Sequence, residues 1–108
     1  MFSINGYLWK IEYVSPHSKI LVRDDGVATI GVTDFNTLTV SIADNLYGAL
    51  LRKVIIHELS HCFVFSYGLK WGRAEEERLC DFVATYGNDI ISIADELTAD
   101  DWYMVYKS

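Results

Sequence analysis

The sequence contains no uninterrupted apolar stretch that approaches the roughly 18 residues needed to cross a bilayer. Charged side chains, among them Arg52, Lys53 and Glu58, interrupt its most apolar region. Residues 1–14 also lack the basic region and the apolar run of a secretory signal peptide. We therefore expect a cytoplasmic protein that makes no contact with a membrane.

Basic residues and cysteines are also scarce. Nine Lys and Arg residues stand against 15 Asp and Glu residues, which gives a net charge of −6. Because binding to a nucleic-acid backbone depends on clustered positive charge, we expect no nucleic acid as a partner. Two cysteines, Cys62 and Cys80, are too few for a disulfide scaffold. We expect both thiols to be buried and to pack as small apolar side chains.

Apolar residues, in contrast, are abundant. The 108 residues are 51% hydrophobic and 14% aromatic, which is sufficient for one packed core. A chain of this length is expected to form a single domain, residues 1–108. Its first 43 residues favour strands and the later ones favour helices. The sequence therefore predicts an α+β fold, in which a small N-terminal sheet of three or four strands packs on helices.

Local patterns give the expected elements. Strand character is found at residues 7–14, 20–22, 27–32 and 37–42. Apolar residues then recur at helical spacing over about residues 45–67, with Asp44 as the expected N-cap and Gly68 as a left-handed C-cap. A second helix is expected to begin at residue 73 or 74 and to reach residue 88 or 97. A short last helix is expected to begin near Thr98 and to hold Trp102 and Tyr106.

The first expected helix contains the sequence His57-Glu58-Leu59-Ser60-His61, an HExxH motif. Residues four positions apart lie on the same helical face, so His57 and His61 can bind one metal ion through their imidazoles. Neutral imidazole is a common zinc ligand. Glu58 is rotated by about 100° from His57, where it can take a proton from water without binding the metal. The motif predicts a catalytic Zn2+ site with Glu58 as the general base.

A catalytic zinc site requires a third protein ligand. The second expected helix begins with the acidic run Glu75-Glu76-Glu77. Because Glu77 and Asp81 lie four residues apart and share a helical face, Glu77 is the predicted ligand. Asp81 is expected to accept a hydrogen bond from the other ring nitrogen of a histidine and so fix its tautomer. For Glu75 and Glu76 we expect only favourable charge at a helix N-terminus and contact with solvent.

HExxH followed on the next helix by ExxxD, here residues 77–81, resembles the gluzincin class of zinc metallopeptidases. The short length, the sheet ahead of the motif and the sequence at 80–84 resemble minimal gluzincins. They also resemble the ImmA/IrrE-type metallopeptidases often encoded by phages and mobile elements. The resemblance covers about residues 27–90 and is specific at the two motifs. It implies a zincin-like fold and a zinc-dependent hydrolase of peptide bonds, with a regulatory protein as one candidate substrate.

The resemblance also implies a substrate-binding strand. In these peptidases the strand before the active-site helix is a sheet edge that pairs with an extended peptide substrate. An unpaired edge offers backbone donors and acceptors, so this role is physically reasonable. The residues assigned to it are Leu38, Thr39, Val40, Ser41 and Ile42. Larger members also use a Tyr or His to stabilise the oxyanion. The candidates in this chain are Tyr67, Tyr86, Tyr103 and Tyr106, and the sequence does not select among them.

Two other functions remain open at this point. A zincin-like module could keep the metal and sequester a protein partner without cleaving it. The short C-terminal half favours this function, whereas the intact Glu58 argues against it, because a structural zinc site needs no carboxylate there. A scaffold without metal would bring Glu58 and Glu77 together without charge compensation, which is costly if both are buried. The sequence does not predict an oligomeric state.

Overall fold

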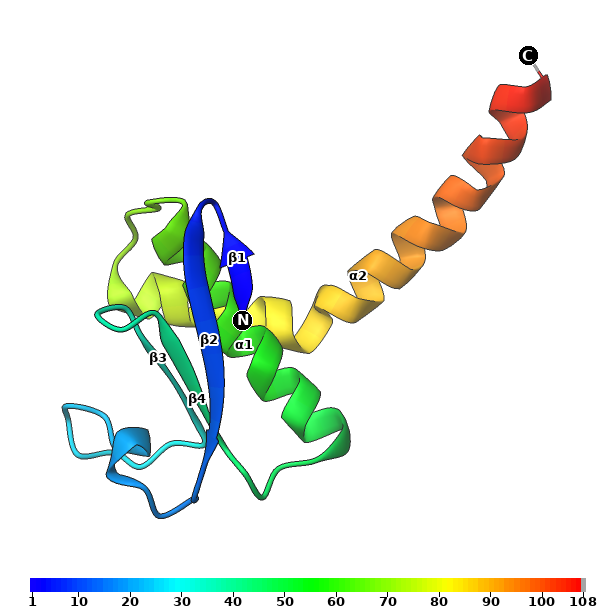
Figure 1. The fold of residues 1–108 in the computed structure, drawn as a ribbon. Coiled ribbons are helices and arrows are strands. Elements are labelled where there is room, and N and C mark those ends of the chain that lie inside the picture. Colours follow the sequence, from blue (N-terminus) through cyan, green and yellow to red (C-terminus); the bar gives the residue numbers. More distant parts are fainter. Residues whose placement is uncertain (108) are drawn as a thin grey trace.

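The computed structural model describes the backbone of residues 1–107 and the side chains of residues 1–99. The predicted α+β class is confirmed, because a four-stranded mixed sheet is followed by two long helices (Figure 1). No helix in the described part of the chain has both the length and the apolar character that crossing a bilayer requires. The elements are β1 (Phe2–Ile4), β2 (Tyr7–Val14), a 3-10 turn (Lys19–Leu21), β3 (Gly31–Asp34), β4 (Thr39–Ala43), α1 (Gly48–Ser66) and α2 (Arg73–Lys107).

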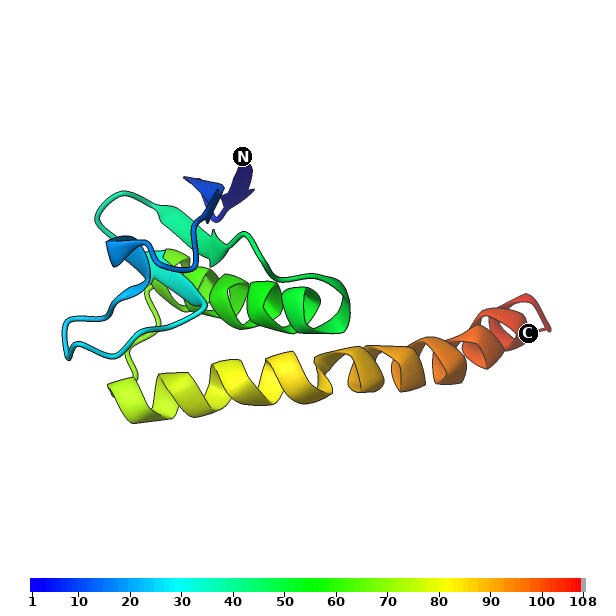
Figure 2. The same cartoon turned by 90° about the horizontal axis from the view of Figure 1, so that it is seen from below.

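The sheet has the strand order β1-β2-β4-β3, so β1 and β3 are its two edges. β1 and β2 are antiparallel, β2 and β4 are parallel, and β4 and β3 are antiparallel. In this register Val40 of β4 lies opposite both Ile11 of β2 and Thr33 of β3. The sheet packs on α1, and Figure 2 shows α1 between the sheet and α2.

The prediction that the strand before α1 is a sheet edge is wrong. β4 lies between β2 and β3, and all five of its residues are buried. Since neighbouring strands occupy both of its sides, β4 cannot pair with a peptide. The residues wrongly predicted to form the substrate-binding edge are Leu38, Thr39, Val40, Ser41 and Ile42. Leu38 lies just before the strand and has a positive φ of 51°.

Other strand predictions are met in part. The strand at 7–14 is confirmed as β2. Residues 20–22 do not form a strand, because the Ser18 hydroxyl accepts a hydrogen bond from the Ile20 backbone N–H (3.2 Å) and starts a 3-10 turn. Only the end of the segment at 27–32 enters the sheet, as the start of β3. β1 was not predicted, since three residues are too few for an alternating pattern to be detected.

The core that holds α1 against the sheet centres on Trp9, which is fully buried. Val40 and Ile42 of β4 join it from the sheet, and Val54 and Cys62 join it from α1. The Trp9 indole N–H donates a hydrogen bond of 2.9 Å to the hydroxyl of Ser66 at the end of α1. The middle of α1, which contains the HExxH motif, is thereby fixed across the sheet.

The sequence predicts the C-terminal end of α1 correctly but not its N-terminal end. Gly68 adopts the predicted left-handed conformation (φ 64°), and the Leu69 N–H donates to the Val64 carbonyl at 3.0 Å, which closes the helix in a Schellman motif. Asp44 is not the N-cap. Its N–H donates to the Val14 carbonyl at 2.8 Å, so the chain is still leaving the sheet there, and Tyr47 occupies the cap position.

Helix α2 runs antiparallel beside α1 and then extends beyond it (Figures 1 and 2). The side chain of Arg52, near the start of α1, donates a hydrogen bond of 3.1 Å to the side-chain oxygen of Asn88. The radius of gyration is 16.9 Å, against about 13 Å for a compact domain of 100 residues. The longest dimension of the molecule, 59 Å, follows from this extension of α2.

The separate last helix expected near Thr98 is not present, because α2 is continuous from residue 73 to residue 107. Thr98 does not cap a helix. Its hydroxyl donates to the carbonyl of Ala94, one turn earlier, at 2.8 Å. The side chains of Trp102 and Tyr106, assigned to that helix, lie outside the described residues.

Candidate metal centre

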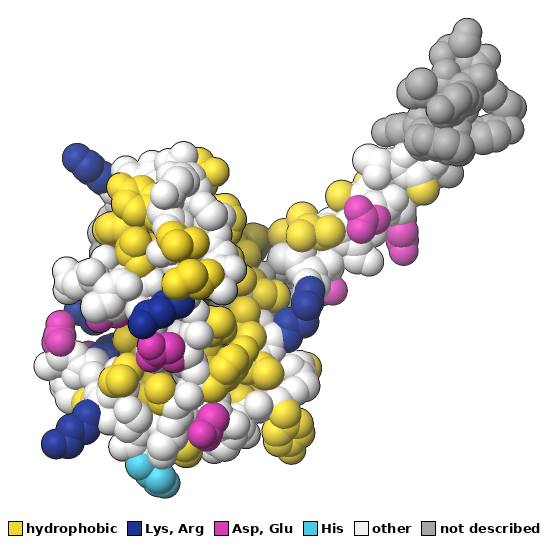
Figure 3. Space-filling model, viewed as in Figure 1, with side chains coloured by type: hydrophobic (Ala, Val, Ile, Leu, Met, Phe, Trp, Pro, Cys, Tyr) yellow, Lys and Arg dark blue, Asp and Glu magenta, His cyan; other side chains and the backbone are white. Residues whose placement is uncertain are grey.

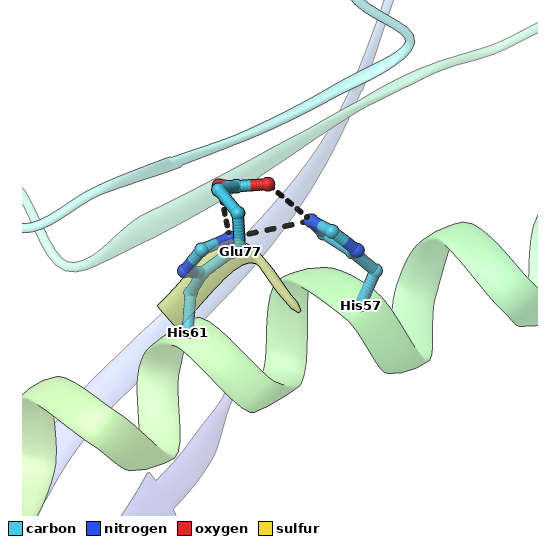
Figure 4. A group of neighbouring side chains, drawn as sticks. All are labelled: His57, His61 and Glu77. Carbon is cyan, nitrogen blue, oxygen red and sulfur yellow. Dashed lines mark hydrogen bonds and ion pairs between the residues drawn. The ribbon is translucent and has the colours of Figure 1, made fainter. Parts of the chain in front are cut away.

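The two histidines of the HExxH motif lie on successive turns of α1 and point toward the start of α2 (Figure 4). Their Nε2 atoms are 3.3 Å apart. Glu77, in the second turn of α2, reaches both rings: its Oε1 is 2.9 Å from His61 Nε2 and its Oε2 is 3.3 Å from His57 Nε2. The structure therefore brings the three predicted ligands together in one group.

The spacing of these atoms fits a zinc ion. Tetrahedral zinc with ligands at about 2.0–2.1 Å places neighbouring ligand atoms about 3.3 Å apart. The two Nε2 atoms are 3.3 Å apart, and each lies 2.9 or 3.3 Å from a different carboxylate oxygen of Glu77, so these distances are at or near that value. Two imidazoles and one carboxylate are also a known ligand set of catalytic zinc sites. Both the geometry and the chemistry of His57, His61 and Glu77 therefore suit Zn2+.

The second nitrogen of each histidine meets a carboxylate from α2. Asp81 Oδ1 lies 2.9 Å from His57 Nδ1, which is the contact expected from its spacing. Glu76 Oε2 lies 2.5 Å from His61 Nδ1. A carboxylate at Nδ1 holds the proton on that nitrogen and leaves the Nε2 lone pair free. Asp81 and Glu76 thus orient both rings with Nε2 toward Glu77.

The expectation that Glu76 only contacts solvent is wrong. Its side chain is mostly buried, whereas Glu75 is exposed as expected. Helical periodicity distinguishes Glu76 from Glu75. Glu76 lies four residues before Cys80, which is fully buried, so both belong to the inward face of α2.

Glu58 lies beside the ligand group but is not part of it. Its carboxylate is buried, with Oε2 4.0 Å from His57 Nε2. The Thr33 hydroxyl on β3 donates a hydrogen bond of 2.8 Å to Glu58 Oε1. Burial raises the pKa of the Glu58 carboxyl above its usual range, and the Thr33 hydrogen bond opposes the rise. A carboxylate whose pKa is moved toward neutrality is better suited to take up a proton as a general base.

Edge strand β3 approaches α1 closely at Gly31. A Cβ atom at this position would lie 2.8 Å from Val54 Cγ1 and 3.2 Å from Glu58 Cγ. The first distance is shorter than side chains tolerate, so the absence of a side chain at Gly31 lets β3 lie against the Glu58 turn of α1.

Replacing Gly31 with alanine is expected to lower the free energy of unfolding by about 1–3 kcal/mol, because the new methyl group overpacks Val54 and Glu58. Gly87→Ala is the matched control. Its Cβ would meet Val83 Cγ1 at an ordinary 3.5 Å within a helix, so that variant should gain about 0.5–1 kcal/mol. Chemical denaturation of both variants measures the difference. Equal effects would show that β3 does not lie this close to α1.

The two cysteines are buried, as expected, and they lie outside the ligand group. Burial raises the pKa of the Cys62 thiol to about 12 and that of the Cys80 thiol to about 12. Both thiols are therefore protonated at neutral pH. Since the thiolate is the form that binds metals, Cys62 and Cys80 act here as small apolar side chains.

The two tyrosine candidates for oxyanion stabilisation whose side chains are described pack against phenylalanines. Tyr67 stacks on Phe63, with ring centroids 6.0 Å apart, and Tyr86 packs against Phe82 at 5.3 Å. Both rings are more than half exposed. The other two candidates, Tyr103 and Tyr106, have side chains outside the described residues.

Comparison with known proteins adds no relative. No protein family, curated protein or solved structure matches this chain.

Proposed function

We propose that this protein is a zinc-dependent metallopeptidase that hydrolyses peptide bonds, with a minimal zincin-like fold of the gluzincin or ImmA/IrrE type. One observation carries the proposal. Two imidazole nitrogens and the Glu77 carboxylate converge in one group, and a buried carboxylate with a raised pKa lies next to them. A site that only held a metal for stability would have no need of Glu58.

The residues have distinct chemical roles in this proposal. His57, His61 and Glu77 would hold the ion, which supplies a Lewis acid that polarises a carbonyl and acidifies water. Glu58 takes a proton from the attacking water as the oxygen–carbon bond forms. It then donates that proton to the leaving amine nitrogen as the carbon–nitrogen bond breaks. Thr33 keeps the Glu58 carboxylate in place through its 2.8 Å hydrogen bond.

Strand β3 replaces β4 as the proposed binding strand for the substrate. It is a sheet edge, paired with β4 on one side. Its residue Thr33 contacts Glu58, so a peptide added to the free side would extend next to the proposed base. Backbone pairing of this kind binds an extended peptide without selecting its side chains. The proposed substrate-binding strand is therefore β3, one strand earlier in the chain than the sequence predicted.

Glu76→Gln and Asp81→Asn are each expected to weaken zinc binding about 10–100-fold, because each removes the carboxylate that orients one histidine. Competition with a chromophoric chelator measures the affinity. Glu75→Gln serves as the control, since Glu75 is exposed and should leave the affinity unchanged. A loss of affinity common to all three variants would indicate a general effect of negative charge instead of ring orientation.

A binding module that holds zinc and grips a protein partner without cleaving it is the second candidate. The specific observation in its favour is that the Tyr67 and Tyr86 rings, two of the four oxyanion candidates, pack on Phe63 and Phe82. Such a module would share the metal site with the peptidase. The two functions therefore differ in hydrolysis and not in zinc content.

The deciding experiment measures zinc content and hydrolysis together on the purified chain. Zinc near one equivalent, with cleavage of unfolded protein substrates that stops on chelation and returns with zinc, supports the peptidase. One equivalent of zinc without cleavage supports the binding module. Absence of zinc after incubation with excess metal would overturn both proposals.

A further inference from the structure

Helix α2 carries an apolar stripe that extends beyond the folded body of the protein. Its residues alternate in steps of four and three, a spacing that places them on one helical face and is typical of a coiled-coil seam. The stripe consists of Leu79, Val83, Tyr86, Ile90, Ile93 and Leu97. Ile90, Ile93 and Leu97 are more than half exposed. Their exposure leaves about two turns of the stripe in solvent.

The N-terminal end of the same stripe forms one wall of an apolar groove. Leu79 and Val83 face Ile56, Leu59 and Phe63 of α1 across a cavity of about 370 Å³. The groove is open, and Phe63 is half exposed in it. Its size and lining suit the apolar side chains of a helix.

One wall of the groove and the exposed stripe belong to the same helix, α2, on either side of the point where it passes the N-terminal start of α1. The contact between Arg52 and Asn88 marks that point, and α2 continues past it without covering (Figure 2). Hydrophobic side chains are visible on this extension next to acidic ones (Figure 3). The protein thus has an apolar groove that lacks a helix and an apolar helix that lacks a groove.

We propose that two copies of this chain associate through antiparallel pairing of their α2 stripes. In this arrangement the projecting half of each helix covers the groove of the other copy, and the same surface is used on both sides. The steps of four and three keep the two seams in contact over the full stripe. Leu79 of one copy then lies opposite Leu97 of the other, and Tyr86 lies opposite Ile90.

The apolar surfaces favour a second copy as the occupant. The groove of each copy is lined by apolar side chains of α1 and α2, and the projecting half of α2 carries an exposed apolar face with the spacing of a coiled-coil seam. One surface of the chain is therefore complementary to another surface of the same chain. The proposal is independent of the metal site.

Sedimentation velocity on the full chain over about 1–100 µM tests the association. The wild type is expected to form a dimer, and Ile90→Glu should raise its dissociation constant at least about tenfold. Ile91→Glu is the matched control, because Ile91 is also more than half exposed but lies off the stripe. A wild type that stays monomeric throughout, or equal weakening by both variants, would overturn the proposal.

Disulfide trapping tests the orientation. The double variant Tyr86→Cys, Ile90→Cys should form a covalent dimer on mild oxidation, whereas Tyr86→Cys alone should not. The native Cys62 and Cys80 are buried and do not compete. Efficient trapping by the single variant would indicate parallel helices, whose projecting halves cannot reach the grooves, and would contradict the proposal.

Discussion

Replacing Glu58 with glutamine is expected to lower kcat/KM for peptide hydrolysis by about 10²–10⁴-fold while zinc stays bound. The amide keeps the size of the side chain and can still accept the hydrogen bond from Thr33, but it cannot take a proton from water. The ligands His57, His61 and Glu77 are unchanged. Stopped assays of hydrolysis, with zinc measured on the same samples, give both quantities.

The metal-free form supplies a control for folding of this variant. Burial raises the pKa of the Glu58 carboxyl in the folded state, so this group costs stability at pH values above its unfolded-state pKa. Glutamine carries no charge, and the metal-free variant should therefore unfold at the same temperature as the wild type or at a higher one. Undiminished hydrolysis in a folded, zinc-loaded variant would rule out Glu58 as the general base.

The Glu77→Ala variant should lose zinc more severely than any other single change outside α1. It removes one of three protein ligands. We therefore expect a larger loss of affinity than the about 10–100-fold expected for the carboxylates behind the histidines. Hydrolysis should fall with the metal at limiting zinc. Equilibrium competition for zinc, followed by activity at increasing zinc concentrations, measures both effects.

Two features make this variant interpretable. Glu77 is partly exposed and is close to other carboxylates, so alanine leaves no buried cavity and reduces repulsion in the metal-free form. The fold should persist, as circular dichroism can verify. Glu75→Ala provides the matched control on the same helix, with an exposed side chain outside the ligand group. If Glu77→Ala retains zinc as tightly as Glu75→Ala, the third ligand is a different residue.

Local sequence patterns were informative wherever the structure is decided by neighbours along the chain. The spacing in HExxH places His57 and His61 on one face of any helix, and the left-handed preference of glycine ends α1 at Gly68. The alternation at 7–14 was likewise sufficient to identify β2. The pattern at residues 20–22 predicted a strand wrongly. There the Ser18 hydroxyl accepts a hydrogen bond from the Ile20 backbone N–H, and a 3-10 turn forms instead.

Strand order could not be read from the sequence. Residues 37–42 alternate cleanly, which is typical of a strand with one solvent face, yet β4 is central and buried on both sides. β4 pairs with β2 across 24 residues of chain, numbers 15–38, and pairing across that distance leaves no local signal. The role of edge strand therefore passes to β3, whose contact with Glu58 depends on Gly31.

By itself the sequence determined the α+β class, the helical pair His57 and His61, and the candidacy of Glu77 and Asp81, because each depends on helical periodicity or composition. Only the tertiary structure decided that Glu76 orients His61, that β3 and not β4 borders the site, and that α2 extends past α1 with an exposed stripe. These features depend on how separate elements pack against one another. Periodicity fixes which face a residue occupies, whereas packing fixes what that face meets.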